Sequence, residues 1–302
     1  MKKTKKNKRG FVLYAFGNKD LDYGKLAVCC ALSIKTNLKN NHTTVVTDEG
    51  TKDWLQSTIP KEVLKAAFDN IIIPNEKFKS GKRRHHDSPW ITFKAEFNNQ
   101  NRVMAYRYSP YEETILIDTD YLIMNDDLDH VWGSNEDLMI NTKAIDLQSN
   151  RFGTVIDQRV SKHGIPLYWA TVVYFKRSKF VSTFFDLVDY IREEYNFFQF
   201  LYEFTEGFYR NDFSFSIAAH ILNGYVTNGI RSLPDDTLLM SYQMDGIAEI
   251  LNPNEIIFLA HNPEEPWKTT LVNIKEMNVH IMNKRELLRI SEKYIDMCME
   301  KI

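Results

Sequence analysis

Two aspartates that follow an apolar segment are the residues best placed for chemistry. Asp118 and Asp120 flank Thr119 directly after the β-forming residues 114–117. Because side chains alternate along a strand, the two carboxylates would point to the same side of the chain. Such a pair suits Mg²⁺ or Mn²⁺, which combine carboxylates with substrate phosphates. The pattern predicts a divalent metal site at the end of a strand.

The same Asp-x-Asp spacing occurs elsewhere, so its context decides its meaning. Two further pairs have it: Asp20 with Asp22, and Asp127 with Asp129. Neither of them directly ends a run of β-forming residues. In open α/β sheets, ligands bind at the carboxyl ends of strands, which favours the pair that follows residues 114–117.

Hydrophobic periodicity predicts the elements that would hold these carboxylates. We expect strands at residues 11–16, 43–48, 114–118, 137–141, 166–175 and 278–282, and helices at 22–37, 61–68, 90–106, 180–202, 211–222 and from 284 onward. The polar segment 81–87 is expected to be a mobile loop. A strand, a helix and a second strand at the start are typical of a parallel sheet. Since no repeat or linker interrupts the pattern, residues 11–302 are expected to form one α/β domain.

Composition excludes several classes of protein. Of 302 residues, 43% are hydrophobic and 26% are charged, which is too apolar for a disordered chain. The longest purely apolar stretch, Leu26–Leu32, is far shorter than the ~20 residues that span a bilayer. Three cysteines without a C-x-x-C pair favour a cytoplasmic protein, in the host cytoplasm if the protein is viral.

The N-terminal residues 1–10 form a basic tail. They include six lysines and arginines, and the apolar run that follows is too short for a secretory signal. A flexible solubilising extension and an arm that binds phosphate groups of nucleic acid or lipid are both compatible with this composition.

The sequence resembles the GT-A nucleotide-sugar glycosyltransferases, in particular the retaining, glycogenin-like group. The resemblance covers most of the chain, and three segments carry it: FVLYAFGNKDLDYGKLAVCCALSIKTN from Phe11, TTVVTD from Thr43, and ETILIDTDYLIMNDDLDHVW from Glu113. It implies a single Rossmann-like GT-A domain with a mixed central sheet flanked by helices. It also implies Mn²⁺ or Mg²⁺, a nucleoside diphosphate-sugar donor, UDP-linked in this group, and transfer with retention of anomeric configuration.

The resemblance also implies roles for residues in the N-terminal half. Asp118 would contact ribose and metal, and Asp120 would be the main metal ligand. Tyr23 falls where the family stacks a tyrosine on uracil. The remaining nucleotide-sugar-binding positions in this half would be Ala15, Asp48 and Lys94.

The C-terminal half matches the family more loosely. Asp212 would be the catalytic carboxylate beneath the sugar, although Phe213 replaces the glutamine that follows it in the family. His280 would be the third metal ligand, with His261 as the alternative. The phosphate-binding residues after it would be Asn283 and Lys284.

This arrangement is chemically coherent. Breaking a sugar–diphosphate bond places negative charge on the leaving group, and a divalent ion together with Lys284 would stabilise that charge. The basic segment 82–86 could close over the diphosphate or hold an acidic acceptor. The acceptor itself, a glycan, a protein or a modified nucleic acid as in viral DNA-modifying glycosyltransferases, stays open.

Two other functions fit parts of the pattern. A phosphatase with an aspartate nucleophile also follows a strand with Asp-x-Asp, but it carries the motif at its first strand and has Thr or Val at the position of Leu122. A non-catalytic module that binds nucleotide sugars or nucleic acid would keep the fold without turnover. The Phe213 replacement leaves that alternative open.

Overall fold

The computed structural model describes residues 8–76, 80–148, 159–161, 164–205, 208–226, 229–234 and 237–302. The four lysines of the basic tail at positions 2, 3, 5 and 6 lie outside these ranges. Arg9 and Gly10, which the sequence analysis assigns to the tail, belong to the first strand. In the described part of the chain, no helix is both long enough and apolar enough to cross a membrane.

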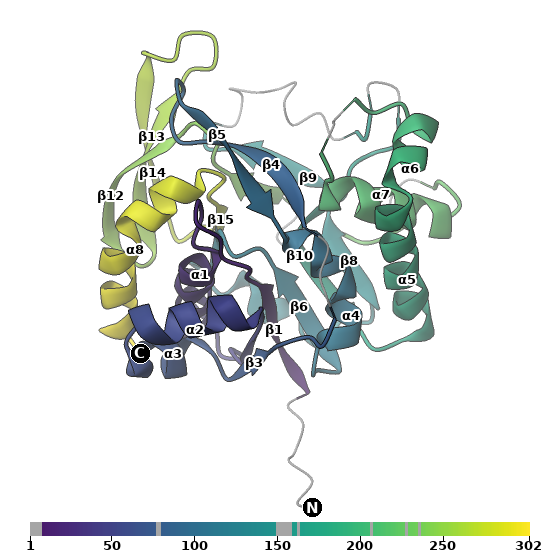
Figure 1. Cartoon of the computed structure of the whole chain (residues 1–302), viewed down its shortest axis with the longest axis horizontal. Helices are drawn as coiled ribbons and strands as arrows, with labels where there is room; N and C mark the ends of the chain where they lie inside the picture. Colours follow the sequence, from purple (N-terminus) through teal and green to yellow (C-terminus); the bar gives the residue numbers. More distant parts are fainter. Residues whose placement is uncertain are drawn as a thin grey trace, which may run out of the picture.

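A six-stranded mixed sheet forms the centre of the molecule (Figure 1). Its order is β3 (Asn70–Ile72), β2 (Thr43–Val46), β1 (Arg9–Tyr14), β6 (Glu113–Ile117), β10 (Trp169–Lys176) and β8 (Leu138–Asn141). The first four strands are parallel, and β10 runs antiparallel to both β6 and β8. The predicted α/β class with a mixed central sheet is confirmed.

Helices gather in two groups, one near each edge of this sheet (Figure 1). The first group is α1 (Tyr23–Asn37), α2 (Glu49–Thr58), α3 (Lys61–Ala67) and α8 (Lys284–Met299). The second is α5 (Lys179–Glu193), α6 (Tyr195–Leu201) and α7 (Asn211–Leu222). Helix α1 is apolar on nearly all sides because α2, α3 and α8 pack around it.

Two smaller sheets extend the core. Four short strands pair in the order β7 (Tyr121–Leu122), β15 (Val279–His280), β11 (Thr237–Met240) and β9 (Lys143–Asp146). The strands β12 (Gly246–Asn252), β13 (Glu255–His261) and β14 (Thr269–Lys275) form an antiparallel meander beside α8. Pairing of β7 with β15 joins the segment after Asp120 to a segment near the C-terminus.

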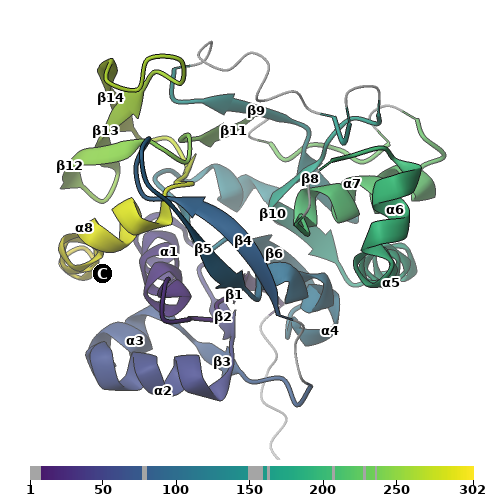
Figure 2. The same cartoon turned by 45° about the horizontal axis from the view of Figure 1, so that its top comes forward.

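Two local predictions were wrong in the region 81–106. Residues 81–97 form a hairpin of β4 (Gly81–His86) and β5 (Thr92–Phe97), instead of a mobile loop followed by a helix. Helical structure begins only afterwards, with η1 (Asn99–Met104) and α4 (Ala105–Tyr108). The residues 92–97 alternate between apolar and polar types, which is the period of a strand. The hairpin lies between α8 and the α5–α7 group in both views (Figures 1 and 2).

The long helix expected at 180–202 is divided. It becomes α5 and α6, separated at Glu194, whose φ of −101° and ψ of 32° depart from helical values. The hydrophobic period continues across this break, so the sequence pattern predicted one continuous helix. In contrast, α7 spans 211–222 as predicted.

Glu113 connects three parts of the sheet. Its Oε1 accepts a hydrogen bond from Arg9 Nε at 3.0 Å, and its Oε2 accepts from Tyr174 Oη at 2.8 Å and Gly133 N at 2.7 Å. Burial raises the pKa of Glu113, but these hydrogen bonds outweigh burial and hold it below its usual value. The ionised carboxylate therefore stabilises the packing of β1, β6 and β10.

Replacing this carboxylate should weaken the fold in a pH-dependent way. Glu113→Gln is expected to lower the free energy of unfolding by about 1–3 kcal/mol at neutral pH, because a charged acceptor of three hydrogen bonds is lost. Since the folded-state pKa is depressed, the contribution is present at neutral pH and disappears as the pH falls through that lowered pKa. Denaturant unfolding at neutral and acidic pH measures this. The exposed Glu112→Gln is the matched control, and an equal loss at both pH values would contradict the prediction.

Candidate active site and metal centre

The turn between β6 and β7 carries the two aspartates. Asp118 follows β6, and its backbone N donates to Thr171 O on β10 at 2.9 Å. Asp120 precedes β7, and its backbone O accepts from Ile281 N at 2.8 Å, directly after β15. The backbone therefore fixes both aspartates where the central sheet meets the small β7–β15 sheet.

His280 completes a cluster with these aspartates. One ligand atom from each of Asp118, Asp120 and His280 lies within 4.8 Å of the others, and no other set of three such groups is found among the described residues. His280 Nε2 is 3.2 Å from Asp120 Oδ2. The alternative His261 lies apart on β13, where its Nδ1 contacts Pro266 O at 2.7 Å.

The donor set of this cluster fits a small divalent cation. Two carboxylates and one imidazole match the preferences of Mn²⁺, and of Mg²⁺ for the carboxylates. Asp120 is 2% exposed, and His280 is 9% exposed. Three protein ligands also leave coordination positions for substrate oxygens.

Positive side chains compensate the two carboxylates. Lys284 Nζ, at the start of α8, donates to Asp120 Oδ2 at 2.5 Å. Burial raises the pKa of Asp120, but Lys284 and His280 outweigh burial and lower it. Burial also raises the pKa of Asp118, and there the opposing charge of Arg102 only partly offsets it. Asp120 is therefore the more firmly ionised of the two.

Arg102 is a site residue that the sequence analysis missed. Its side chain is 2% exposed, and its Nη1 donates to Asp118 Oδ1 at 2.7 Å. Its Nη2 donates to Thr171 O at 3.4 Å. The available signal was the position of Arg102 directly before the apolar residues Val103–Ala105. An arginine that is buried along with such residues needs an anionic partner.

Asp212 lies in the wall of the same cavity as the metal-site aspartates. Its Oδ1 accepts from Ala170 N on β10 at 3.0 Å, and its Oδ2 accepts from Arg210 Nη2 at 3.3 Å. Asp212 is inside the first turn of α7, whose N-cap is Arg210. These contacts tie α7 to β10 beside the metal site.

Three further residues that the sequence analysis assigned to nucleotide binding are Tyr23, Lys94 and Asn283. Tyr23 is 1% exposed, and burial, with the charges of Asp120 and Asp118, raises the pKa of its hydroxyl. Lys94 is exposed on β5 and lines neither the metal-site cavity nor the larger one beside it. Asn283 caps α8 and donates from Nδ2 to Asp245 O at 3.1 Å.

Ala15 and Asp48 make hydrogen bonds to residues near a third cavity, which shares no lining residue with the metal-site cavity. Ala15 is fully buried, and its O accepts from Thr47 Oγ1 at 2.5 Å. Asp48 caps α2 by accepting from Thr51 N at 2.6 Å. Thr51 lines a cavity of about 520 Å³, together with the half-exposed ring of Trp54.

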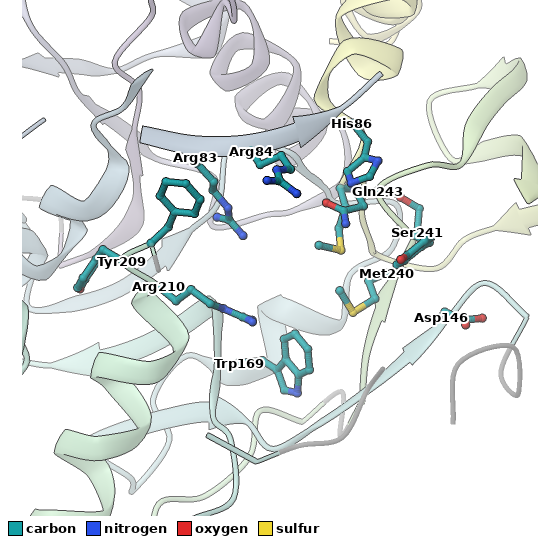
Figure 3. Close-up of a pocket in the computed structure, with 13 residues that line it drawn as sticks. Arg83, Arg84, His86, Asp146, Trp169, Tyr209, Arg210, Met240, Ser241 and Gln243 are labelled. Atoms are coloured by element: carbon teal, nitrogen blue, oxygen red, sulfur yellow. Dashed lines mark hydrogen bonds between the residues drawn. The ribbon is translucent and has the colours of Figure 1, made fainter. Parts of the chain in front are cut away.

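The metal-site cavity has a volume of about 70 Å³. Beside it lies a larger cavity of about 360 Å³, whose lining residues are drawn in Figure 3. It shares five lining residues with the metal-site cavity: Arg83, Trp169, Arg210, Met240 and Met282. The two cavities are therefore contiguous, so a molecule in the larger one would face the metal site.

No protein-family model matches the sequence, and no curated protein matches it. Solved structures do match. The galactosyltransferase LgtC, solved with donor and acceptor sugar analogs, is 12% identical, with 96% of this chain and 95% of that chain covered at a TM-score of 0.47. The glycosyltransferase GlyE of Streptococcus pneumoniae TIGR4 is 14% identical, with 76% and 46% covered at 0.45.

The mannosyltransferase PcManGT from Pyrobaculum calidifontis, solved with GDP-Man and Mn²⁺, is 11% identical, with 77% of this chain and 56% of that chain covered at a TM-score of 0.40. All three are glycosyltransferases. This chain thus matches about half the length of GlyE and of PcManGT, and almost the whole of LgtC.

The pairing of Asp120 with Lys284 should be measurable without any ligand. The two side chains are only 4% and 13% exposed. We expect Asp120→Asn to cost about 3 kcal/mol of stability, because it leaves a buried ammonium without its counter-charge. A double-mutant cycle with Lys284→Met should show coupling of about 1–3 kcal/mol in urea unfolding. Additive effects of the two substitutions would show that the ion pair does not stabilise the metal-free protein.

Proposed function

We propose that this protein is a metal-dependent glycosyltransferase that moves a sugar from a nucleoside diphosphate-sugar to an acceptor hydroxyl. The convergence of Asp118, Asp120 and His280 carries the proposal. These residues come from segments about 160 positions apart, and their ligand atoms lie within 4.8 Å of one another. A UDP-linked donor, Mn²⁺ as the ion and retention of configuration follow from the resemblance of the sequence to the glycogenin-like group.

The chain would hold the cation and the donor with separate groups. Asp118, Asp120 and His280 would be the metal ligands. The bound ion would supply Lewis-acid stabilisation of the diphosphate. Lys284 places an ammonium at Asp120, where it can contact the same leaving group and stabilise its developing charge. Asn283, as the N-cap of α8, places backbone N–H groups beside Lys284, and a helix N-terminus favours phosphate.

Asp212 would act on the sugar. Its carboxylate is held by Ala170 N and Arg210 at the border of the metal-site cavity. A carboxylate beneath the sugar ring would stabilise positive charge that develops at the anomeric carbon. Ala15, Tyr23 and Asp48 belong to the side where the nucleotide base would bind. The cavity beside Trp54 is a candidate for that base.

Further properties complete the proposal. One continuous hydrophobic core includes residues from Phe11 to Cys298, which supports one domain over residues 11–302. All three cysteines are free and buried, which supports a cytoplasmic location. Arg102 donates a hydrogen bond to Asp118, and we propose it as a further basic residue of the donor site, in addition to Lys94.

Donor binding tests the proposal directly. UDP, GDP, CDP and ADP are compared with Mn²⁺ and then with chelator. At a hundredfold excess over Kd, one of them should stabilise the protein by about 2.7 kcal/mol, a rise in melting temperature of about 5 °C. Asp120→Asn should abolish the rise, and the exposed Asp53→Asn should retain it. Stabilisation that survives the chelator, or no stabilisation by any of the four, would refute a metal-dependent donor site.

Asp212 is expected to affect turnover and to leave donor binding intact. Asp212→Asn keeps an oxygen for Ala170 N but removes the negative charge. We expect metal-dependent release of nucleoside diphosphate from the donor to slow by about 100-fold or more, with an unchanged donor Kd. The control is Asp186→Asn on the exposed face of α5. A turnover rate equal to that of the parent protein would remove Asp212 from the reaction.

A further inference from the structure

The larger cavity has a wall of three arginines. Arg83 and Arg84 extend from β4. Arg210, the N-cap residue of α7, approaches from the opposite side of the cavity (Figure 3). In the described part of the chain, no carboxylate forms an ion pair with Arg83 or Arg84. We call these three residues the arginine cluster. Its positive charge is local, because the whole chain has a net charge of −2.

Among the described residues that line the larger cavity, only one carries a negative charge. Asp146 is the single carboxylate among the residues that the structure places around this cavity, and it is 3% exposed. Its Oδ1 accepts from Gln148 N at 2.6 Å, and Figure 3 shows it at the far edge. Arg210 shares the charge of Asp212 in the adjoining cavity. The cluster therefore presents excess positive charge to an occupant.

The hairpin that carries Arg83 and Arg84 is firmly docked. The Arg285 guanidinium lies 3.7 Å from the centre of the Phe93 ring on β5. Asn283 Nδ2 donates to Asp87 O at 3.1 Å, and Asn18 Nδ2 donates to Glu96 O at 3.0 Å. These contacts fix the hairpin against the first helix group and its loops, and thereby fix the backbone positions from which Arg83 and Arg84 extend.

The rest of the cavity suits a sugar. Trp169 lies across from Arg83 and Arg84, on the same side as Arg210, and it lines both the larger cavity and the metal-site cavity. An aromatic ring offers an apolar surface to the C–H face of a sugar. Ser241 and His86 add polar groups, and burial lowers the pKa of His86, so it is uncharged at neutral pH. A volume of about 360 Å³ is at the small-molecule end of binding sites.

We propose that the acceptor is an anionic sugar, whose phosphate or carboxylate group is bound by the arginine cluster while its ring packs on Trp169. This inference rests on the transferase activity proposed above. Arginine matches both anions because its guanidinium forms two parallel hydrogen bonds to either. The acceptor hydroxyl would then face Asp212 and the metal ligands across the shared border.

Binding to the metal-free protein tests this without any donor. The probes are glucose 6-phosphate, glucuronic acid, glucose and inorganic phosphate, measured by calorimetry at low and high salt. One anionic sugar should bind at least tenfold more tightly than glucose, and salt should weaken it. Whether glucose 6-phosphate or glucuronic acid binds more tightly shows whether the arginine cluster prefers phosphate or carboxylate. Equal affinity for glucose, or inorganic phosphate that binds as tightly as the sugar phosphate, would overturn the proposal.

Variants identify the residues. Arg84→Gln should weaken the anionic sugar about tenfold and leave glucose unchanged, since one charge-assisted contact is lost. Arg107→Gln is the control, because Arg107 pairs with Glu76 on the surface and lines neither cavity. Unchanged affinity in Arg84→Gln would overturn the assignment. A single-stranded oligonucleotide that binds more tightly than both sugars, and loses affinity in Arg84→Gln, would replace the sugar by a nucleic acid.

The two proposals can fail separately. The donor test measures nucleotide binding that depends on metal and on Asp120. The anionic-sugar test is made without metal and without nucleotide, so its result does not depend on donor binding. Loss of donor binding with retained sugar binding would refute the transferase alone. The reverse result would refute the anionic acceptor alone.

Discussion

Two carboxylates at the end of one strand, Asp120 buried and Asp118 partly buried, require positive partners, and the site is arranged around that requirement. Asp118 and Asp120 are two residues apart, so each raises the cost of ionising the other. Arg102 compensates Asp118, whereas Lys284 and His280 compensate Asp120. These partners come from η1, β15 and α8. The folding of those segments onto the sheet is therefore coupled to the charge of the site.

The same requirement explains why the site can accept a cation. Lys284 Nζ lies against Asp120 Oδ2, an oxygen of the carboxylate proposed as a metal ligand. A bound cation would take over part of that compensation, and the lysine charge would then be shared with a phosphate ligand.

The two ends of the shared cavity differ in their carboxylates. At the metal end, Asp118, Asp120 and Asp212 lie among positive side chains that include Arg102 and Lys284. At the other end, the arginine cluster and Trp169 form the wall, and Asp146 is the one carboxylate among the described lining residues. A hairpin fixed against α8 makes this second end possible. The molecule therefore places a cluster of potential metal ligands next to a wall that is rich in arginine.

Much of the fold and part of the site were predictable from local patterns. The strands that begin at Phe11, Thr43 and Thr114 were expected to within a few residues, because β-forming runs are bounded by polar turns. The hairpin at 81–97 was not, since its first strand is a run of basic residues whose pairing depends on β5. The meander β12–β14 was also missed, because each of its strands is only partly buried.

The sequence by itself determined the strand that ends in Asp118 and Asp120, because alternation and turn chemistry are local. It also indicated His280, Lys284 and Asp212 through resemblance, while leaving His261 as an alternative. Only the tertiary structure decided that His280 joins the aspartates, that Arg102 lies against Asp118, and that three arginines line the cavity next to the metal site. These contacts join residues up to 164 positions apart. Such contacts arise from packing and charge compensation in the folded core, which no local sequence period encodes.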